Sequence, residues 1–120
     1  MLAKATNPTK VLLVDDEPDI NQAFSCILQK SGFEVQSALS ADEALDILEN
    51  WPPDILLSDY NMPEKNGGDL LIAVREQFPA LKNRMDFIFL TGSLTDVQSD
   101  SRCDGIQVIE KPVRLRVLGV

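Results

Sequence analysis

Short apolar runs recur along the chain, and most are followed at once by polar or charged residues. Three of them are continuous and too short for a convincing helix, a fourth is interrupted by Gln107 alone, and a fifth stretch alternates apolar and polar side chains. Continuous runs of this kind are typical of strands buried on both faces of a parallel sheet. The pattern predicts five strands, at residues 11–14, 33–38, 55–59, 87–90 and 106–109.

The segments between these strands show helical periodicity. In the first, the spacing of apolar residues predicts one buried helix face, made of Ile20, Ala23, Phe24, Ile27 and Leu28. Ser40 and Glu43 form a predicted capping box at the start of a second helix, and residues 67–78 are expected to form a third. Residues 93–105 hold few apolar positions, so they predict only a short or irregular fourth helix.

Strands and helices that alternate with short connections indicate an α/β protein, with a doubly wound parallel sheet covered by helices on both faces. The 120 residues fit a single domain, 1–120, in which residues 1–9 form a loose polar leader. A fifth helix would be truncated, because only eight residues follow Pro112. Two explanations are open: a domain cut from a longer chain, or a stand-alone domain with a stunted last helix.

Composition excludes several classes of function. Nineteen acidic and eleven basic residues give a formal net charge of −8, which argues against direct nucleic-acid binding, since that depends on Lys and Arg. No apolar run approaches the roughly 18 residues of a membrane span. Two cysteines without metal or redox spacing favour reduced thiols in a cytoplasmic protein. The absence of histidine excludes a Ser-His-Asp triad, a histidine metal site and a phosphohistidine within the chain.

Candidate chemistry gathers at the ends of the predicted strands. The first strand ends on Asp15 and Asp16, the third on Asp59, the fourth on Thr91, and the fifth leads into Lys111. In a parallel sheet these ends lie on the same edge, where open α/β folds bind their ligands. Three carboxylates a few ångströms apart would repel by roughly 4 kcal/mol per pair at an effective dielectric constant near 20. A divalent cation would remove that conflict, and oxygen ligands favour Mg²⁺ or Mn²⁺ over zinc.

Beside such a cation, Asp59 can act as a carboxylate nucleophile toward phosphorus and form an aspartyl phosphate. The Lys111 ammonium and the Thr91 hydroxyl are suited to phosphoryl oxygens. Gly92 leaves the backbone bare, so that a phosphoryl group can approach it closely. Each of these residues alone has an ordinary structural explanation, and only their joint placement indicates a phosphoacceptor site.

Together these positions resemble the receiver domain of two-component response regulators, in the CheY-like superfamily. The resemblance covers about residues 9–113 and rests on four motifs: Val-Asp-Asp-Glu-Pro at 14–18, Asp59 followed by Met62-Pro63 and Gly67, Thr91-Gly92, and Lys111-Pro112. It implies a five-stranded flavodoxin-like sheet with strand order 2-1-3-4-5. It also implies a cis peptide bond between Lys111 and Pro112.

The resemblance further implies the roles of individual residues. The implied ligands of Mg²⁺ are Asp15, Asp16, Asp59 and the backbone carbonyl of Asn61. Asp59 is then the phosphoacceptor, and Thr91 and Lys111 assist the transfer. Asn61 and Ser93 flank the pocket and are expected to influence how long the phosphoryl group lasts.

A receiver is a phosphoprotein of a phosphorelay rather than an enzyme, although it promotes its own phosphorylation and dephosphorylation. The implied donor is a histidine kinase or a histidine phosphotransfer protein. The implied target is an output partner or a fused effector domain that the sequence does not name, and homodimer formation is left open.

Two positions depart from the family pattern. Receivers usually carry an aromatic residue on strand five, three residues before the lysine, whose rotamer follows the threonine and reports phosphorylation. Here Val108 takes that place and has no large rotamer to change. The span from Thr91 to Lys111 is also short, with Gly105 one step too close to Lys111. The fourth helix and the usual output face are therefore expected to differ from the pattern.

Two other functions share some of these features. One is a binding module that keeps the fold but is not phosphorylated in use, which Val108 and the altered fourth helix favour. The other is a Mg²⁺-dependent phosphohydrolase similar to the haloacid dehalogenases. That family needs a second aspartate two residues after its nucleophile as general acid, and Asn61 cannot donate a carboxylic proton.

Overall fold

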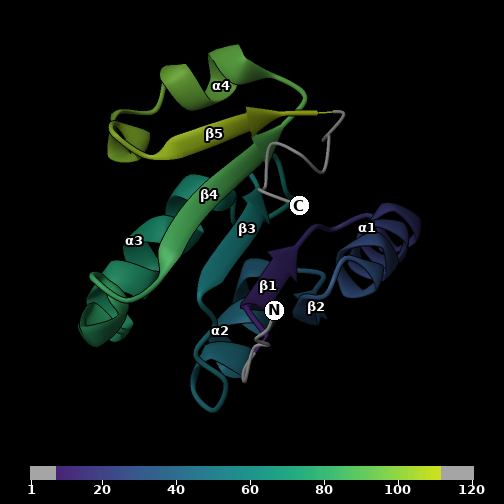
Figure 1. Cartoon of the computed structure of the whole chain (residues 1–120). Coiled ribbons are helices and arrows are strands. Elements are labelled where there is room, and N and C mark those ends of the chain that lie inside the picture. Colours follow the sequence, from purple (N-terminus) through teal and green to yellow (C-terminus); the bar gives the residue numbers. More distant parts are fainter. Residues whose placement is uncertain (1–7, 112–120) are drawn as a thin grey trace.

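The computed structural model describes residues 8–111, and in that part of the chain five parallel strands form one sheet in the order β2-β1-β3-β4-β5 (Figure 1). The order expected from the receiver resemblance is confirmed. All predicted strands are present, with ends shifted by at most one residue. Their bounds are β1 Lys10–Val14, β2 Glu34–Ala38, β3 Ile55–Asp59, β4 Asp86–Thr91 and β5 Gln107–Glu110.

Helices connect the strands and cover both faces of the sheet (Figure 1). The α-helices are α1 Pro18–Lys30, α2 Ala41–Leu48, α3 Gly67–Gln77 and α4 Leu94–Gln98, and short 3₁₀ turns lie at η1 Pro79–Leu81 and η2 Ser101–Cys103. None of the helices in residues 8–111 is long and apolar enough to cross a membrane. The expected cis bond at Pro112 and the truncated last helix lie outside the described residues.

Alternating side chains of the buried strands pack into hydrophobic clusters on opposite faces of the sheet. On β1, Leu12 and Val14 pack toward α2 and α3, while Val11 and Leu13 pack toward α1 together with Leu28. These side chains are at most 1% exposed. A strand that is apolar on both faces therefore has a packing role at every position, which is why the continuous runs of the sequence form central strands.

The predicted inner face of α1 is confirmed at Leu28, which is fully buried, and at Phe24, which packs against the same cluster. It was wrong at Ile20 and Ile27, which are each 44% exposed, and it left out the polar Asn21, which is only 3% exposed. Residues 21 and 28 lie seven positions apart, on one line of the helix, which is turned about 100° from the line through residues 20 and 27. The Asn21 amide turns inward because two backbone carbonyls at the end of the sheet accept its hydrogen bonds.

Local hydrogen bonds fix where α2 and α3 begin. The Ser40 hydroxyl accepts from the Glu43 N–H, as predicted, but the Glu43 carboxylate accepts from the N–H of Leu39 rather than of Ser40. At α3, Asn66 and Asp69 form a complete capping box that the sequence analysis missed. Both caps place a carboxylate near the positive end of a helix dipole.

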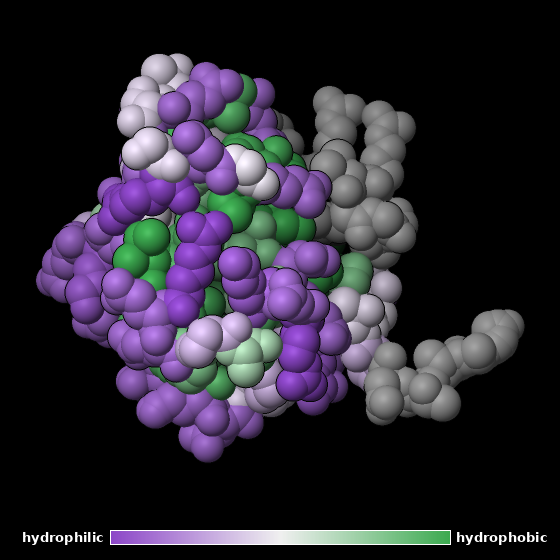
Figure 2. Space-filling view, turned by 90° about the vertical axis from the view of Figure 1, so that its left-hand side faces the viewer, coloured by the Kyte–Doolittle hydropathy of each residue, from purple (hydrophilic) through white to green (hydrophobic). Residues whose placement is uncertain are grey.

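The fourth helix is short, as predicted. The α4 helix has only five residues, and the η2 turn that follows it has three. A cavity of about 350 Å³ lies between α3 and the beginnings of β4 and β5; its apolar lining includes Val74, Phe78 and Ile106. Figure 2 shows this side of the molecule, where apolar residues are visible between polar ones.

Candidate phosphoacceptor and metal site

The three predicted acids meet at the carboxyl edge of the sheet. Asp15 follows β1 directly, Asp16 is next in the chain, and Asp59 is the last residue of β3. One carboxylate oxygen from each lies within 4.8 Å of the others. Asp15 and Asp59 are only 2% and 6% exposed. Buried carboxylates this close together repel one another, so either a proton or a nearby cation must offset their charge.

One cation is supplied by the protein itself. The Lys111 ammonium lies 3.3 Å from Oδ2 of Asp15 and 3.4 Å from Oδ2 of Asp59. The Lys111 N–H donates to the carbonyl of Thr91, which fixes the end of β5 against β4. The pairing of β5 with β4 therefore brings Lys111 from the edge strand to within ion-pair distance of Asp15 and Asp59.

The pKa values show that one lysine does not fully compensate the cluster. Burial raises the pKa of Asp59; Lys111 opposes this shift, and the charges of Asp15 and Asp16 add to it, so the net direction is upward. Burial alone would lower the pKa of Lys111, but the charges of Asp59 and Asp15 outweigh it and raise the value. The carboxylates remain a site that favours a further positive charge.

The donor set fits a hard divalent cation. It consists of carboxylate oxygens, and the chain contains no histidine that could bring in zinc. The three acids are the residues that would hold the ion. The side chain of Asn61 is exposed and donates to Oδ2 of Asp96 at 3.1 Å, so it points to α4, and the role of its backbone carbonyl stays a prediction.

Thr91 lies at the tip of β4 and is fully buried. Its hydroxyl accepts from the N–H of Ser93 at 2.9 Å and donates to the Ser93 carbonyl at 3.0 Å. The hydroxyl predicted to donate a hydrogen bond to a phosphoryl oxygen is thus at the expected strand end, but it donates into the β4–α4 loop instead. Donation to a phosphoryl group would require this hydroxyl to turn and to release the loop.

Asn21 is a supporting residue that the sequence analysis missed. Its Nδ2 donates to the carbonyl of Asp15 at 3.0 Å and to the carbonyl of Ala38 at 2.9 Å. The Asp15 N–H also donates to Ala38. These bonds fix the backbone that carries the acid pair. The only signal in the sequence was a polar residue beside the apolar stripe of a helix.

Gly67, the first residue of α3, lies directly against the end of β3, which carries Asp59. Its N–H donates to the carbonyl of Tyr60 at 2.7 Å. A Cβ atom at Gly67 would lie 2.7 Å from the Phe89 ring and 2.8 Å from the carbonyl oxygen of Asp59. Only glycine therefore allows α3 to begin this close to the acceptor.

Replacing Gly67 by alanine is expected to lower the free energy of unfolding by about 2 kcal/mol, because the new methyl group overpacks against backbone and a buried ring. The matched control is Gly92→Ala, since a Cβ at Gly92 meets nothing within 4 Å. Urea unfolding of both variants would measure the difference. Equal midpoints for the two variants would contradict the predicted close contact.

The sequence matches a known protein family over most of its length. A family model described as the response regulator receiver domain matches residues 11–119. The chain belongs to this family. The response regulator PilR of Pseudomonas aeruginosa is 31% identical over 106 residues, which are 88% of this receiver chain and 23% of PilR. The sensor kinase CckA of Brucella abortus is 40% identical over 88 residues, which are 72% of this chain and 9% of the kinase.

Solved structures agree with this assignment. Chemotaxis protein CheY4 of Vibrio cholerae superposes with a TM-score of 0.81 at 31% identity, covering 94% of this chain and 98% of CheY4. The response regulator TrrA of Thermotoga maritima, solved with Mg²⁺-BeF, gives a TM-score of 0.79 at 26% identity, covering 92% and 93% of the two chains. The receiver chain thus spans nearly all of these structures but less than a quarter of PilR. It is a two-component signalling domain.

Proposed function

We propose that Asp59 accepts a phosphoryl group from a phosphohistidine on a partner protein and that the phosphorylated domain acts as a signalling switch. The observation that carries the proposal is the meeting of Asp15, Asp16 and Asp59 beside Lys111 at one edge of the sheet. Membership of the receiver family supports the same function. The donor would be a histidine kinase or a histidine phosphotransfer protein, and the output partner would recognise the altered surface.

In the proposed step, one carboxylate oxygen of Asp59 attacks phosphorus and the bond from phosphorus to the donor nitrogen breaks. The nitrogen keeps the electron pair and the other ring nitrogen takes one proton from solvent, so the products are an acyl phosphate on Asp59 and a neutral imidazole on the donor. Lys111 stays within ion-pair distance of Asp59 and balances the charge on the phosphoryl oxygens. Asp15 and Asp16 are positioned to hold the divalent ion, which when bound neutralises phosphoryl oxygens.

The residue two positions after Asp59 argues against a phosphohydrolase. Asn61 has no acidic proton for a leaving group, and its amide donates to Asp96 on the short α4 helix. Hydrolysis of the aspartyl phosphate would therefore be the slow reset of a switch. We infer that the domain has no turnover on free phosphomonoesters.

A direct test uses a small phosphodonor, acetyl phosphate, with Mg²⁺ and the purified chain. Intact-protein mass spectrometry is expected to find one added phosphate per molecule, and chelation of Mg²⁺ is expected to suppress it. Repeated turnover of p-nitrophenyl phosphate without a stable adduct would instead indicate a hydrolase. No adduct under any of these conditions would favour the unphosphorylated binding module.

A further inference from the structure

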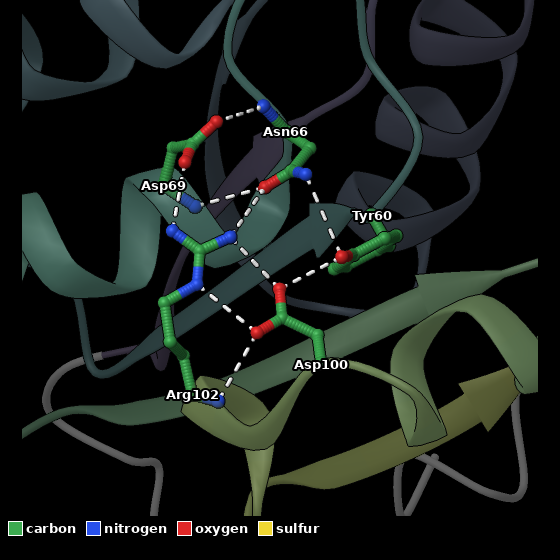
Figure 3. A network of polar contacts seen from close by, with 5 residues as sticks. All are labelled: Tyr60, Asn66, Asp69, Asp100 and Arg102. Atoms are coloured by element: carbon green, nitrogen blue, oxygen red, sulfur yellow. Dashed lines mark hydrogen bonds and ion pairs between the residues drawn. The ribbon is translucent and has the colours of Figure 1, made fainter.

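A polar network joins the acceptor loop to the connection that replaces a full fourth helix. Figure 3 shows Tyr60 from the end of β3, Asn66 and Asp69 from the start of α3, and Asp100 and Arg102 from the η2 region. None of these five residues is among the proposed metal ligands or phosphoryl contacts. The network lies on the side of the sheet where Val108 takes the place of the usual reporting aromatic residue.

Tyr60 follows the acceptor directly and is held at every polar atom. Its side chain is buried, and the residue as a whole is 7% exposed. Its N–H donates to the carbonyl of Leu90 at 3.2 Å, and its own carbonyl accepts from Gly67. The ring packs edge-on against Phe89, with 5.8 Å between centroids. Its hydroxyl donates to Oδ2 of Asp100 at 2.8 Å. Only one peptide unit separates Tyr60 from Asp59, so a displacement of Asp59 would reach Tyr60 directly.

Asp100 and Arg102 carry the connection from Tyr60 to α3. Asp100 accepts from the Arg102 backbone N–H at 3.1 Å and from Nε and Nη2 at 3.0 and 2.8 Å. Arg102 Nη1 donates to Asp69 at 2.8 Å, and Asp69 caps α3 with Asn66. Gly68 makes room for this contact, because a Cβ there would overlap Asp100 and lie 2.6 Å from Arg102. The network therefore holds η2 on the first turn of α3.

We propose that Tyr60 is the positioning residue that couples the state of Asp59 to residues 94–103, the role that Val108 cannot fill. This coupling rests on the proposed phosphorylation. The β4–α4 loop leaves the site at Thr91, and residues 94–103 end at the network, so the segment is attached to the acceptor at both ends. A phosphoryl group that drew Thr91 inward would pull one end while Tyr60 controls the other.

The test compares wild type with Tyr60→Phe, which removes one hydroxyl and keeps the buried ring. Amide hydrogen exchange of residues 94–103 is measured before and after phosphorylation with acetyl phosphate and Mg²⁺. In the free form, losing a hydrogen bond to a carboxylate is expected to speed exchange there about tenfold. In wild type, phosphorylation is expected to change exchange in this segment. In Tyr60→Phe that change is expected to vanish, while uptake of phosphate stays as in wild type.

The matched control is Ser99→Ala, which removes a hydroxyl that lies within residues 94–103 itself. Among the described residues the Ser99 hydroxyl donates only to the Thr95 carbonyl, at 2.8 Å, so this variant is expected to keep the phosphorylation-dependent change. A purely structural role of Tyr60 would speed exchange equally in both states and leave the difference intact. That result would overturn the coupling but not the proposed function. So would hydrogen exchange of residues 94–103 that does not change when wild type is phosphorylated. Failure of wild type to take up phosphate overturns the proposed function and the coupling with it, whereas the free-state comparison still measures the contact to Asp100.

Since Tyr60 is the only tyrosine of the chain, a single labelled tyrosine gives a second readout by NMR. Its ring signal is expected to shift on phosphorylation of wild type. Asp100→Asn, which removes the carboxylate charge and keeps the shape, is expected to reduce that shift. An unchanged shift in Asp100→Asn would show that the ring senses Asp59 without passing the change to η2.

Discussion

Lys111→Met is expected to destabilise the metal-free domain by about 2 kcal/mol at neutral pH. The substitution keeps the aliphatic chain but leaves Asp15 and Asp59 buried without their shared cation. Removing one partner of a fully buried pair costs about 3 to 5 kcal/mol, and the value is lower here because the Lys111 side chain is 26% exposed. Mg²⁺ is expected to recover part of the loss, because binding to the folded state alone adds stability.

The stability difference between wild type and Lys111→Met is expected to depend on pH both above and below neutrality. The raised pKa of Lys111 means that its contribution is complete below the ordinary lysine pKa and is lost as pH rises through the folded-state value. Because the pKa of Asp59 is raised, its carboxylate takes up a proton at a higher pH than an ordinary aspartate does. In Lys111→Met this protonation removes the buried charge that has lost its lysine partner. The difference between wild type and Lys111→Met is therefore expected to be largest near neutral pH and to narrow in both directions.

Chemical denaturation at several pH values, with and without Mg²⁺, measures this difference. The matched control is Lys65→Met, because Lys65 also pairs with an aspartate but both side chains are more than half exposed. Exposed pairs contribute little, so the control is expected to unfold like wild type. A Lys111→Met variant as stable as this control would show that the acids do not depend on the lysine.

Asp59→Asn is expected to abolish phosphate uptake, because an amide has no carboxylate oxygen to attack phosphorus. The same change is expected to raise the stability of the metal-free domain. Burial and the neighbouring acids disfavour the charged form of Asp59, and Lys111 keeps its contact with Asp15. With Mg²⁺, wild type should become the more stable of the two, because the bound ion stabilises wild type and the variant has lost one of the proposed ligands.

The control is Asp54→Asn, a change just before the other end of the same strand. The Asp54 carboxylate accepts from the N–H of Lys10 and is exposed. This variant is expected to take up phosphate as wild type does. Intact-protein mass spectrometry and thermal unfolding with and without Mg²⁺ measure both effects. Equal phosphate uptake by Asp59→Asn and wild type would remove Asp59 from the proposed role.

Much of the fold could be predicted because the central strands β1, β3 and β4 are buried on both faces and appear in the sequence as apolar runs. The same runs placed Asp15, Asp59, Thr91 and Lys111 at one sheet edge, and the structure brings the acids and Lys111 together there. This prediction of the site was reliable because it depended only on the positions at which the strands end. Parallel pairing then placed those ends side by side.

Side-chain partners were not predictable in the same way. The inner face of α1 was misjudged because a buried Asn21 satisfies backbone carbonyls, and apolar periodicity assigns such a residue to the surface. The network of Tyr60, Asp100 and Arg102 joins residues about 40 apart in sequence, and nothing in local pattern pairs them. The irregular path of residues 93–105 was predicted, but the contacts that hold it require coordinates.

We propose Asp59 as the residue that accepts phosphate, beside an ion held by Asp15 and Asp16. To test this directly, the chain is treated with acetyl phosphate and Mg²⁺, and the phosphate is located by fragmenting the peptides of the protein. We expect a single phosphate on Asp59 that disappears when Mg²⁺ is chelated. A phosphate on Asp15 or Asp16, or one that forms equally well without a divalent ion, would contradict it.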